Sequence, residues 1–378
     1  MTEYGFLSTF PPTQCGLATF TTALMASLVR PGVDTARVVQ AVEELRTVAD
    51  PVVGNLVAGD EVSARRTAEL LGRCDVAVVQ HEYGIYGGPD GDEVLGVLQA
   101  LHVPTILVLH TVLSDPSPHQ REVLEAAAAA SDAVVTMART PRQRLARGYE
   151  IDMAKVHVIP HGAPPLPAVA ARDETSRRPT VLTWGLIGPG KGIEWGIEAM
   201  AHLRDLDPQP HYVVVGETHP KVRIHQGEAY RTALAERARE LDVEPMVTLD
   251  ARYLTSEDLA ELVAGADLVL LPYESTDQVT SGVLVEAVAA GIPVVATRFP
   301  HAVELLETGA GRVVPHRDPA AMAAAIRDVL TRPDLAAAMR REAATIAPTL
   351  LWSAVGERYR RLAAAIRTPG AAVRRWDA

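Results

Sequence analysis

Short apolar runs alternate along the chain with stretches of helical periodicity. Most of these runs are apolar throughout instead of alternating with polar residues, which is typical of parallel strands buried on both faces. Strands are expected at 4–8, 37–42, 75–80, 105–110, 133–137, 156–160, 180–184, 211–216, 246–250, 267–272, 293–297 and 312–315.

Helical patterns fill the intervals between these runs. Asp318 followed by Pro319 has the composition of a capped helix start. Helices are expected at 194–206, 228–241, 256–265, 281–290 and 318–330. Strands that alternate with helices in this way predict an α/β fold with doubly wound parallel sheets.

One segment, 162–179, interrupts this rhythm with four prolines and no apolar period. We interpret it as a linker. Five or six strands are expected on each side of it, so the pattern predicts two Rossmann-like domains facing a central cleft. The predicted divisions are an N-terminal domain at 1–162, a linker at 163–179, a C-terminal domain at 180–350 and a terminal helical segment at 351–378.

Charge and cysteine content narrow the class of protein. The 378 residues include 36 basic and 47 acidic side chains, and the net charge of −11 disfavours binding to a long nucleic acid. Two cysteines make no disulfide framework. The sequence shows neither a signal peptide nor a long apolar span, so a cytoplasmic protein is expected.

The strongest local signal is the glycine-rich stretch 185–192 between an expected strand and an expected helix. Free backbone N–H groups at a helix start, together with Lys191, would make a phosphate cradle that includes Gly190. An ordinary turn with a surface lysine is the alternative. The stretch nearly matches an ATP-binding P-loop, but Gly192 stands where that motif needs a hydroxyl for Mg²⁺.

A second cluster, 277–286, leads from a buried strand into a helix. Thr280 and Ser281 are natural N-cap residues, and with Gly282 they would form another anion site. Glu286 could accept two hydrogen bonds from a diol such as a ribose. A capped helix with one solvated glutamate is the alternative.

Further candidate ligand-binding residues lie in the first half of the chain. Gly16, in the loop 10–20, would let a ligand approach the backbone. His81, Glu82 and Tyr83, like His110, are expected in loops after strands, where polar and aromatic groups suit sugar binding. A structural role for His110 is the alternative.

The order of these clusters resembles the retaining glycosyltransferases of family four (glycosyl transferases group 1), which have the GT-B fold. The resemblance spans nearly the whole chain. It covers the Gly16 loop, His110, 159–162, 185–192, 278–286, 291–297 and the helix 352–362. It implies a nucleotide-sugar donor bound mainly by the second domain, an acceptor bound mainly by the first, and a last helix that crosses back to the first domain.

The resemblance also implies roles for the matching positions. The donor diphosphate would be bound by Gly16, Gly190, Lys191, Thr280, Ser281 and Gly282, and the donor ribose by Glu286. His110 would lie beside the transferred sugar, and Gln278 would occupy a catalytic position with Lys191 and Glu286. His81, Glu82 and Tyr83 are assigned to the acceptor side. Transfer of a hexose would proceed without metal or cofactor and with retention, by departure and attack on one face.

Two positions depart from the family pattern. Leu186 stands where an arginine is common, and Gln278 stands where the first of two glutamates is common. These departures keep open a non-catalytic sugar-nucleotide-binding protein, beside a P-loop-like ATP-binding protein and a sugar epimerase or phosphorylase. The sequence does not identify the base of the donor, nor whether the acceptor is a saccharide, a lipid or a small molecule. No basic amphipathic helix supports contact with a membrane, and the arginines of 139–147 are interpreted as a solvated face.

Overall fold

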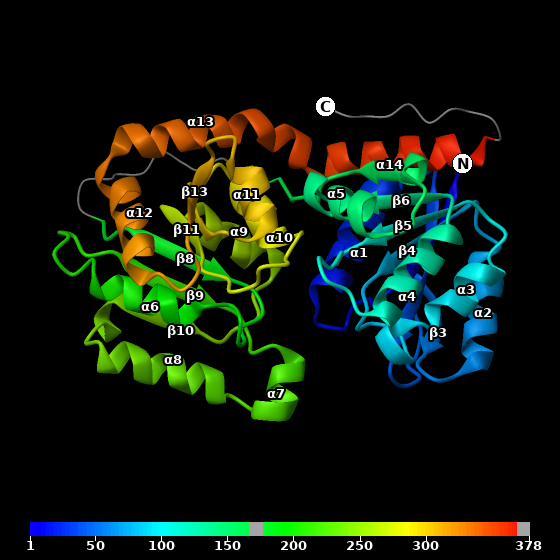
Figure 1. Ribbon diagram of the computed structural model, residues 1–378, viewed down its shortest axis with the longest axis horizontal. Helices are drawn as coiled ribbons and strands as arrows, with labels where there is room; N and C mark the ends of the chain where they lie inside the picture. The colour runs from blue at the N-terminus through cyan, green and yellow to red at the C-terminus, as the bar shows by residue number, and fades with distance from the viewer. Residues whose placement is uncertain (166–176, 369–378) are drawn as a thin grey trace. The chain divides into compact units, whose positions relative to one another are not determined.

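The computed structural model describes residues 1–165 and 177–368 (Figure 1). The chain divides into two compact units. The first holds residues 1–162 and a C-terminal segment that starts at Trp352, and the second holds 163–351. Most of the predicted linker, residues 166–176, lies outside the described residues.

The first unit is a parallel sheet of seven strands in the order β3-β2-β1-β4-β5-β6-β7. Its strands are β1 (Glu3–Ser8), β2 (Thr35–Val42), β3 (Val52–Val57), β4 (Val76–His81), β5 (Thr105–Leu109), β6 (Ala133–Thr136) and β7 (Val156–Val158). Its helices are α1 (Gly16–Leu28), α2 (Glu61–Leu71), α3 (Val94–Ala100), α4 (Pro118–Ala129), α5 (Arg139–Gly148) and α14 (Trp352–Arg367).

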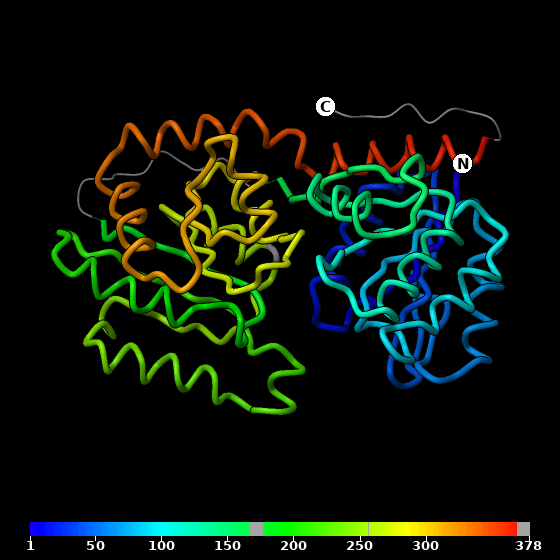
Figure 2. The backbone as a smooth tube through the Cα atoms, viewed as in Figure 1, coloured from blue at the N-terminus to red at the C-terminus, as the bar shows by residue number. Residues whose placement is uncertain are grey.

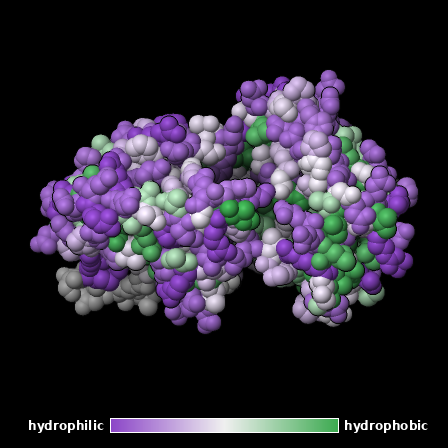
Figure 3. Space-filling model, turned by 90° about the horizontal axis from the view of Figure 1, so that it is seen from below, coloured by the Kyte–Doolittle hydropathy of each residue, from purple (hydrophilic) through white to green (hydrophobic). Residues whose placement is uncertain are grey.

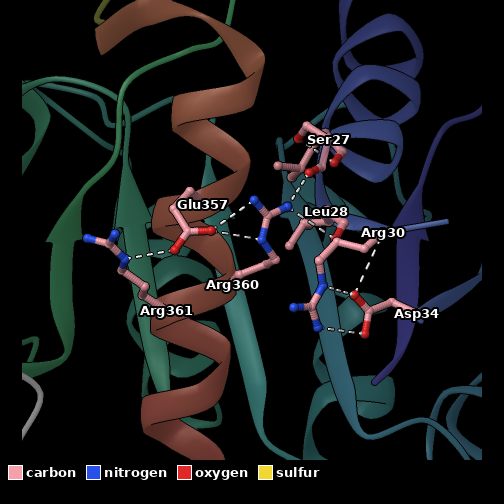
Figure 4. A network of polar contacts seen from close by, with 8 residues as sticks. Ser27, Leu28, Arg30, Asp34, Glu357, Arg360 and Arg361 are labelled. Carbon is pink, nitrogen blue, oxygen red and sulfur yellow. Dashed lines mark hydrogen bonds and ion pairs between the residues drawn. The ribbon is translucent and has the colours of Figure 1, made fainter. Parts of the chain in front are cut away.

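Helix α14 belongs to the first unit although more than 180 residues separate it from the rest of that unit (Figure 2). Gly356 lets it approach α1, because a Cβ there would lie 2.5 Å from the carbonyl oxygen of Ser27. Arg360, held by Glu357, donates to the carbonyl oxygens of Ser27 and Leu28 at the end of α1 (Figure 4). The expected return of the last helix to the first domain is therefore confirmed.

The second unit is a parallel sheet of six strands in the order β10-β9-β8-β11-β12-β13. Its strands are β8 (Thr180–Trp184), β9 (His211–Val215), β10 (Val247–Asp250), β11 (Leu268–Leu271), β12 (Val294–Thr297) and β13 (Gly311–Val314). Its helices are α6 (Ile193–Ala201), α7 (Pro220–Gln226), α8 (Ala229–Glu240), α9 (Ser256–Ala264), α10 (Gly282–Ala289), α11 (Pro300–Leu306), α12 (Pro319–Thr331) and α13 (Pro333–Leu350).

The burial of the central strands explains why their sequences are apolar throughout. Every residue of β4, β5, β6, β11 and β12 is buried, with helices packed on both faces of each sheet. The predicted α/β class with two doubly wound sheets is confirmed.

Several element predictions were wrong. The edge strand β3 was missed because it is only partly buried and contains Gly54 and Asn55. Helix α6 ends at Ala201, not at 206, although Leu203 continues the apolar period into the core. Helices α2, α3, α7, α11 and α13 are among those that were not predicted. Within residues 1–165 and 177–368, no helix has the length and apolarity needed to cross a bilayer.

Candidate functional site

The glycine-rich turn joins β8 to α6 in the second unit. Gly192, the N-cap of α6, has a φ of 64°, and a Cβ at this position would collide with the carbonyl oxygen of Pro272. Gly190 has a φ of 85° and open space around it. The residue that breaks the P-loop pattern is therefore required by the local backbone, because only glycine combines this φ with so close an approach.

Lys191 projects from this turn toward the end of β11. Its ammonium nitrogen lies 4.4 Å from the ring centroid of Tyr273, a cation–π contact. Burial lowers the pKa of Lys191. In the described part of the chain, no carboxylate pairs with this ammonium. A cation without a carboxylate beside it is suited to bind an anionic ligand.

The start of α10 lies next to this turn in the fold. Ser281 is the N-cap, and its hydroxyl accepts from the N–H of Leu284 at 3.3 Å. The N–H of Ser281 donates to Nδ1 of the buried His301 at 2.9 Å. Both polar groups of Ser281 thus have partners within the protein. The buried hydroxyl of Thr280 has none among the described residues, and Gly282 opens the helix.

Glu286 lies on the second turn of α10. Its carboxylate accepts from the indole N–H of Trp184 at 3.3 Å. Burial raises the pKa of Glu286 to about 7, and the Trp184 hydrogen bond opposes this rise. The environment of Glu286 is therefore unlike that of a solvated surface glutamate. A carboxylate with few hydrogen-bond donors around it can accept further hydrogen bonds from a ligand.

Gln278 and Lys191 line one cavity of about 460 Å³ together with Gly190. Gln278 donates from its amide to the carbonyl oxygen of Thr280 at 3.0 Å. Glu274 lines the same cavity, where Arg317 and Trp195 donate to it at 2.7 and 2.9 Å and lower its pKa. The cavity thus combines a cation with groups that bind hydroxyls.

The carboxyl ends of β9 and β10 also meet. The N–H of Gly216, after β9, donates to the carbonyl oxygen of Asp250 at the end of β10. Arg231 of α8 donates to the carbonyl oxygen of Gly216. Two further buried nitrogens of Arg231 have no hydrogen-bond partner in the described residues. This arginine was not singled out from the sequence.

His110 follows β5 in the first unit and is held on several sides. Its Nε2 lies 2.7 Å from Oε1 of Gln80. Its ring makes an edge contact with Phe20, which also contacts His161 and Trp352. Burial, helped by the nearby His161, lowers the pKa of His110 to about 3. His110 is therefore neutral at physiological pH.

The acceptor-side residues are placed differently from expectation. Gln80 and His81 are part of β4 and not of the loop after it, and His81 is only 1% exposed. Burial lowers the pKa of His81 to about 4. The strand continues one residue beyond its predicted end at 80, so the loop assignment of His81 was wrong. Glu82 and Tyr83 do follow the strand, half-buried. Glu82 accepts from Thr111, and Tyr83 donates to the carbonyl oxygen of Gln120.

Gly16 is the first residue of α1 and is exposed, with open space where a Cβ would stand. The N-cap of α1 is Cys15, whose sulfur accepts from the N–H of Ala18 and lies 3.1 Å from the hydroxyl of Thr9. Cys15 is therefore a capping residue.

The sequence reasoning missed four residues of this region: Trp184, Tyr273, His301 and Arg317. The first two stand at the ends of predicted strands, a signal that could have found them. His301 and Arg317 lie beyond β12 and β13, where no motif marks them. Over the described residues, no group of three or more His, Cys, Asp or Glu side chains is placed to hold a metal ion.

Comparisons with known proteins find a matching family model and similar sequences. The family model described as glycosyl transferases group 1 matches residues 178–332. A GDP-mannose-dependent alpha-(1-6)-phosphatidylinositol monomannoside mannosyltransferase of Mycolicibacterium smegmatis is 27% identical over 359 residues, which are 87% of this chain and 89% of that protein.

Solved structures share the architecture. A glycosyltransferase from Rickettsia africae superposes with a TM-score of 0.76 at 15% identity, over 98% of this chain and 100% of that one. Anabaena HepE, solved in complex with UDP and glucose, superposes with a TM-score of 0.73 at 17% identity, over 96% of this chain and 100% of that one. The chain has the GT-B fold of these structures, and its residues 178–332 match the glycosyl transferases group 1, the family that its motifs resemble.

Proposed function

We propose that this glycosyltransferase moves a hexose from a nucleotide-diphosphate sugar to an acceptor hydroxyl, with retention of the anomeric configuration and without a metal ion. The observation that carries the proposal is the presence of two ligand-ready groups, Lys191 and Glu286, at one edge of the second sheet. Lys191 has no carboxylate beside it in the described residues, and Glu286 has only Trp184 as a recorded hydrogen-bond donor.

Lys191 supplies the charge that bond cleavage needs. When the bond between the anomeric carbon and the diphosphate oxygen breaks, the electron pair stays on that oxygen. An ammonium and helix-start N–H groups placed at the oxygen stabilise this charge, an effect worth about 3–4 kcal/mol per donor in other enzymes. The acceptor oxygen then bonds to the anomeric carbon on the same face, and its proton passes to the departing phosphate oxygen.

Glu286 would bind the ribose of the donor. A carboxylate with few partners gains two hydrogen bonds from a diol, and Trp184 orients it for this contact. Gln278 and Glu274, which line the 460 Å³ cavity with Lys191, would bind hydroxyls of the transferred sugar. His110, Glu82 and Tyr83 of the first unit would serve the acceptor.

The relatives suggest which donors to test first. One is named as GDP-mannose-dependent, and Anabaena HepE was solved with UDP. The protein would be incubated with UDP-glucose, GDP-mannose and ADP-glucose, with inositol phosphate and phosphatidylinositol as trial acceptors. EDTA would be present throughout. We expect one donor to be consumed only in the presence of an acceptor, with the anomeric configuration of the product retained by NMR.

Thermal shifts with UDP, GDP, ADP and Mg-ATP separate the alternatives. A ligand at 100 times its Kd adds about 2.7 kcal/mol, which shifts the unfolding temperature by several degrees. Stabilisation by Mg-ATP alone would overturn the proposal in favour of an ATP-binding protein. Tight binding of a nucleoside diphosphate without turnover of any donor would identify a non-catalytic member, and an inverted product would refute the retaining step.

A further inference from the structure

A second chain segment lies beside the glycine-rich turn. The segment that follows β9 is hydrogen-bonded to the turn, with Ile187 N–H donating to Glu217 O at 2.8 Å and His219 N–H donating to Ile187 O at 2.7 Å. A bridge of the parallel type joins Ile187 to Thr218. The start of α7 is therefore held against the turn by backbone contacts.

This juxtaposition encloses a cavity of about 260 Å³, separate from the cavity that contains Gln278. It is lined by Leu186, Gly188, Pro189, Lys191, His219, Lys221 and Val222. Gly188 permits the close fit, since a Cβ there would lie 3.1 Å from Cγ2 of Val222. Lys191 lines both cavities.

The cavity concentrates positive charge. The chain contains three lysines, Lys155, Lys191 and Lys221, and two of them line this one cavity. Among the described residues that line it, three are basic and none is acidic. Leu186, Pro189 and Val222 make the remaining wall apolar, and low polarity beside the charges strengthens electrostatic attraction to an anion.

The pKa of His219 is affected by the same positive charges. Burial, followed by the charges of Lys191 and Lys221, lowers its pKa. Its ring is therefore neutral near pH 7, and Nδ1 accepts from the N–H of Lys221 at 3.2 Å. The proton of the neutral ring then sits on Nε2, which can donate to an oxygen.

We propose that Lys221 binds the phosphate groups of the sugar donor together with Lys191, with His219 as a neutral donor beside them. This deepens the proposed function, on which it rests, by naming a phosphate-binding residue outside the predicted motifs. Leu186 contributes only apolar surface, so the second charge of the site comes from α7. The unit that carries α7 and α8 presents a mostly hydrophilic surface when seen from below (Figure 3).

The test compares three variants of the full chain. Lys221→Gln removes the charge and keeps much of the stem, and Lys221→Arg keeps the charge. Arg223→Gln removes a charge from the same helix at an exposed residue that does not line the cavity. The affinities of inorganic pyrophosphate, UDP, GDP, uridine and guanosine are measured by calorimetry at low ionic strength.

We expect Lys221→Gln to weaken binding of pyrophosphate and of the preferred nucleoside diphosphate by about tenfold, since a charge-assisted hydrogen bond is lost. The affinity for the bare nucleoside should stay unchanged. Lys221→Arg should recover most of the loss, and Arg223→Gln should change the affinity less than twofold. The dependence on salt should also weaken in Lys221→Gln.

Equal pyrophosphate affinity in Lys221→Gln and the wild type would overturn this assignment, as would equal effects of Lys221→Gln and Arg223→Gln. Either result would leave the proposed function standing if UDP or GDP still binds. Absence of binding by every nucleoside diphosphate would refute the proposed function. The pyrophosphate titrations would then still decide the role of Lys221, and a wild type that does not bind pyrophosphate would refute it.

Discussion

Trp184 and Glu286 are 102 residues apart in the sequence, yet the indole N–H of one donates to the carboxylate of the other at 3.3 Å. One residue ends β8, and the other lies in α10. This hydrogen bond is the only one recorded for the Glu286 side chain within the described residues, and burial raises its pKa to about 7. The carboxylate is held at a cost in stability, as is common for a group kept for a ligand.

The raised pKa of Glu286 predicts a pH-dependent stability. The native state holds this proton up to about pH 7, whereas the unfolded chain loses it near 4.5, so the free energy of unfolding falls as pH rises through that interval. Glu286→Gln should remove this fall and raise the free energy of unfolding at pH 8 by about 1–3 kcal/mol. Urea unfolding at pH 5 and pH 8 measures the difference.

The same variant should lose function. The amide has one acceptor oxygen where the carboxylate has two charged ones, so the ribose loses a hydrogen bond and turnover of the donor should fall by about 100-fold or more. A variant that is more stable at pH 8 and inactive is the expected combination. An active Glu286→Gln enzyme would contradict the assignment to the donor, even if its stability rises.

Lys191 should be dispensable for folding and essential for turnover. Its ammonium is partly buried beside Tyr273 with no carboxylate recorded among the described residues, so Lys191→Met should not lower the unfolding temperature. Turnover should fall by about 10²–10³-fold. Stabilisation by a nucleoside diphosphate in a thermal-shift assay should disappear. Near-normal turnover in Lys191→Met would remove Lys191 from the site.

His301 should act as a positioning residue for the start of α10. It accepts from the N–H of Ser281 at 2.9 Å, and its loss leaves that buried donor unpaired. His301→Ala should lower stability by about 1–3 kcal/mol and lower kcat by about tenfold. His301→Asn, whose amide oxygen can accept, should restore part of kcat. Equal kcat values for the Ala and Asn variants would show that the hydrogen bond does not position the helix.

Gly356 should be required for the stability of the first unit. Gly356→Ala places a methyl group 2.5 Å from the carbonyl oxygen of Ser27, so α14 must shift away from α1. The expected loss is about 1–3 kcal/mol in denaturant unfolding. Gly96→Ala is the matched control, because Gly96 lies exposed in α3 with nothing within 4 Å. That change should be neutral or slightly stabilising. Equal effects at both positions would contradict the close packing of α14.

The central strands and the glycine-rich turn were predictable because local rules govern them. A strand buried on both faces must be apolar throughout, and β8, β11 and β12 are visible in the sequence for that reason. Lys191 and Ser281 were found by their places at helix starts. The edge strand β3 and the burial of His81 followed no local pattern, because both depend on what the neighbouring strands cover.

The sequence by itself determined the α/β class, the two sheets and the positions of Lys191 and Glu286. Their surroundings were decided only by the tertiary structure. His301 beside Ser281, Trp184 beside Glu286 and Lys221 beside Lys191 pair residues 20, 102 and 30 positions apart. Parallel strands bring such residues together because their carboxyl ends meet at one edge of a sheet, whatever length of chain lies between them. No periodicity or motif records which side chains will meet there.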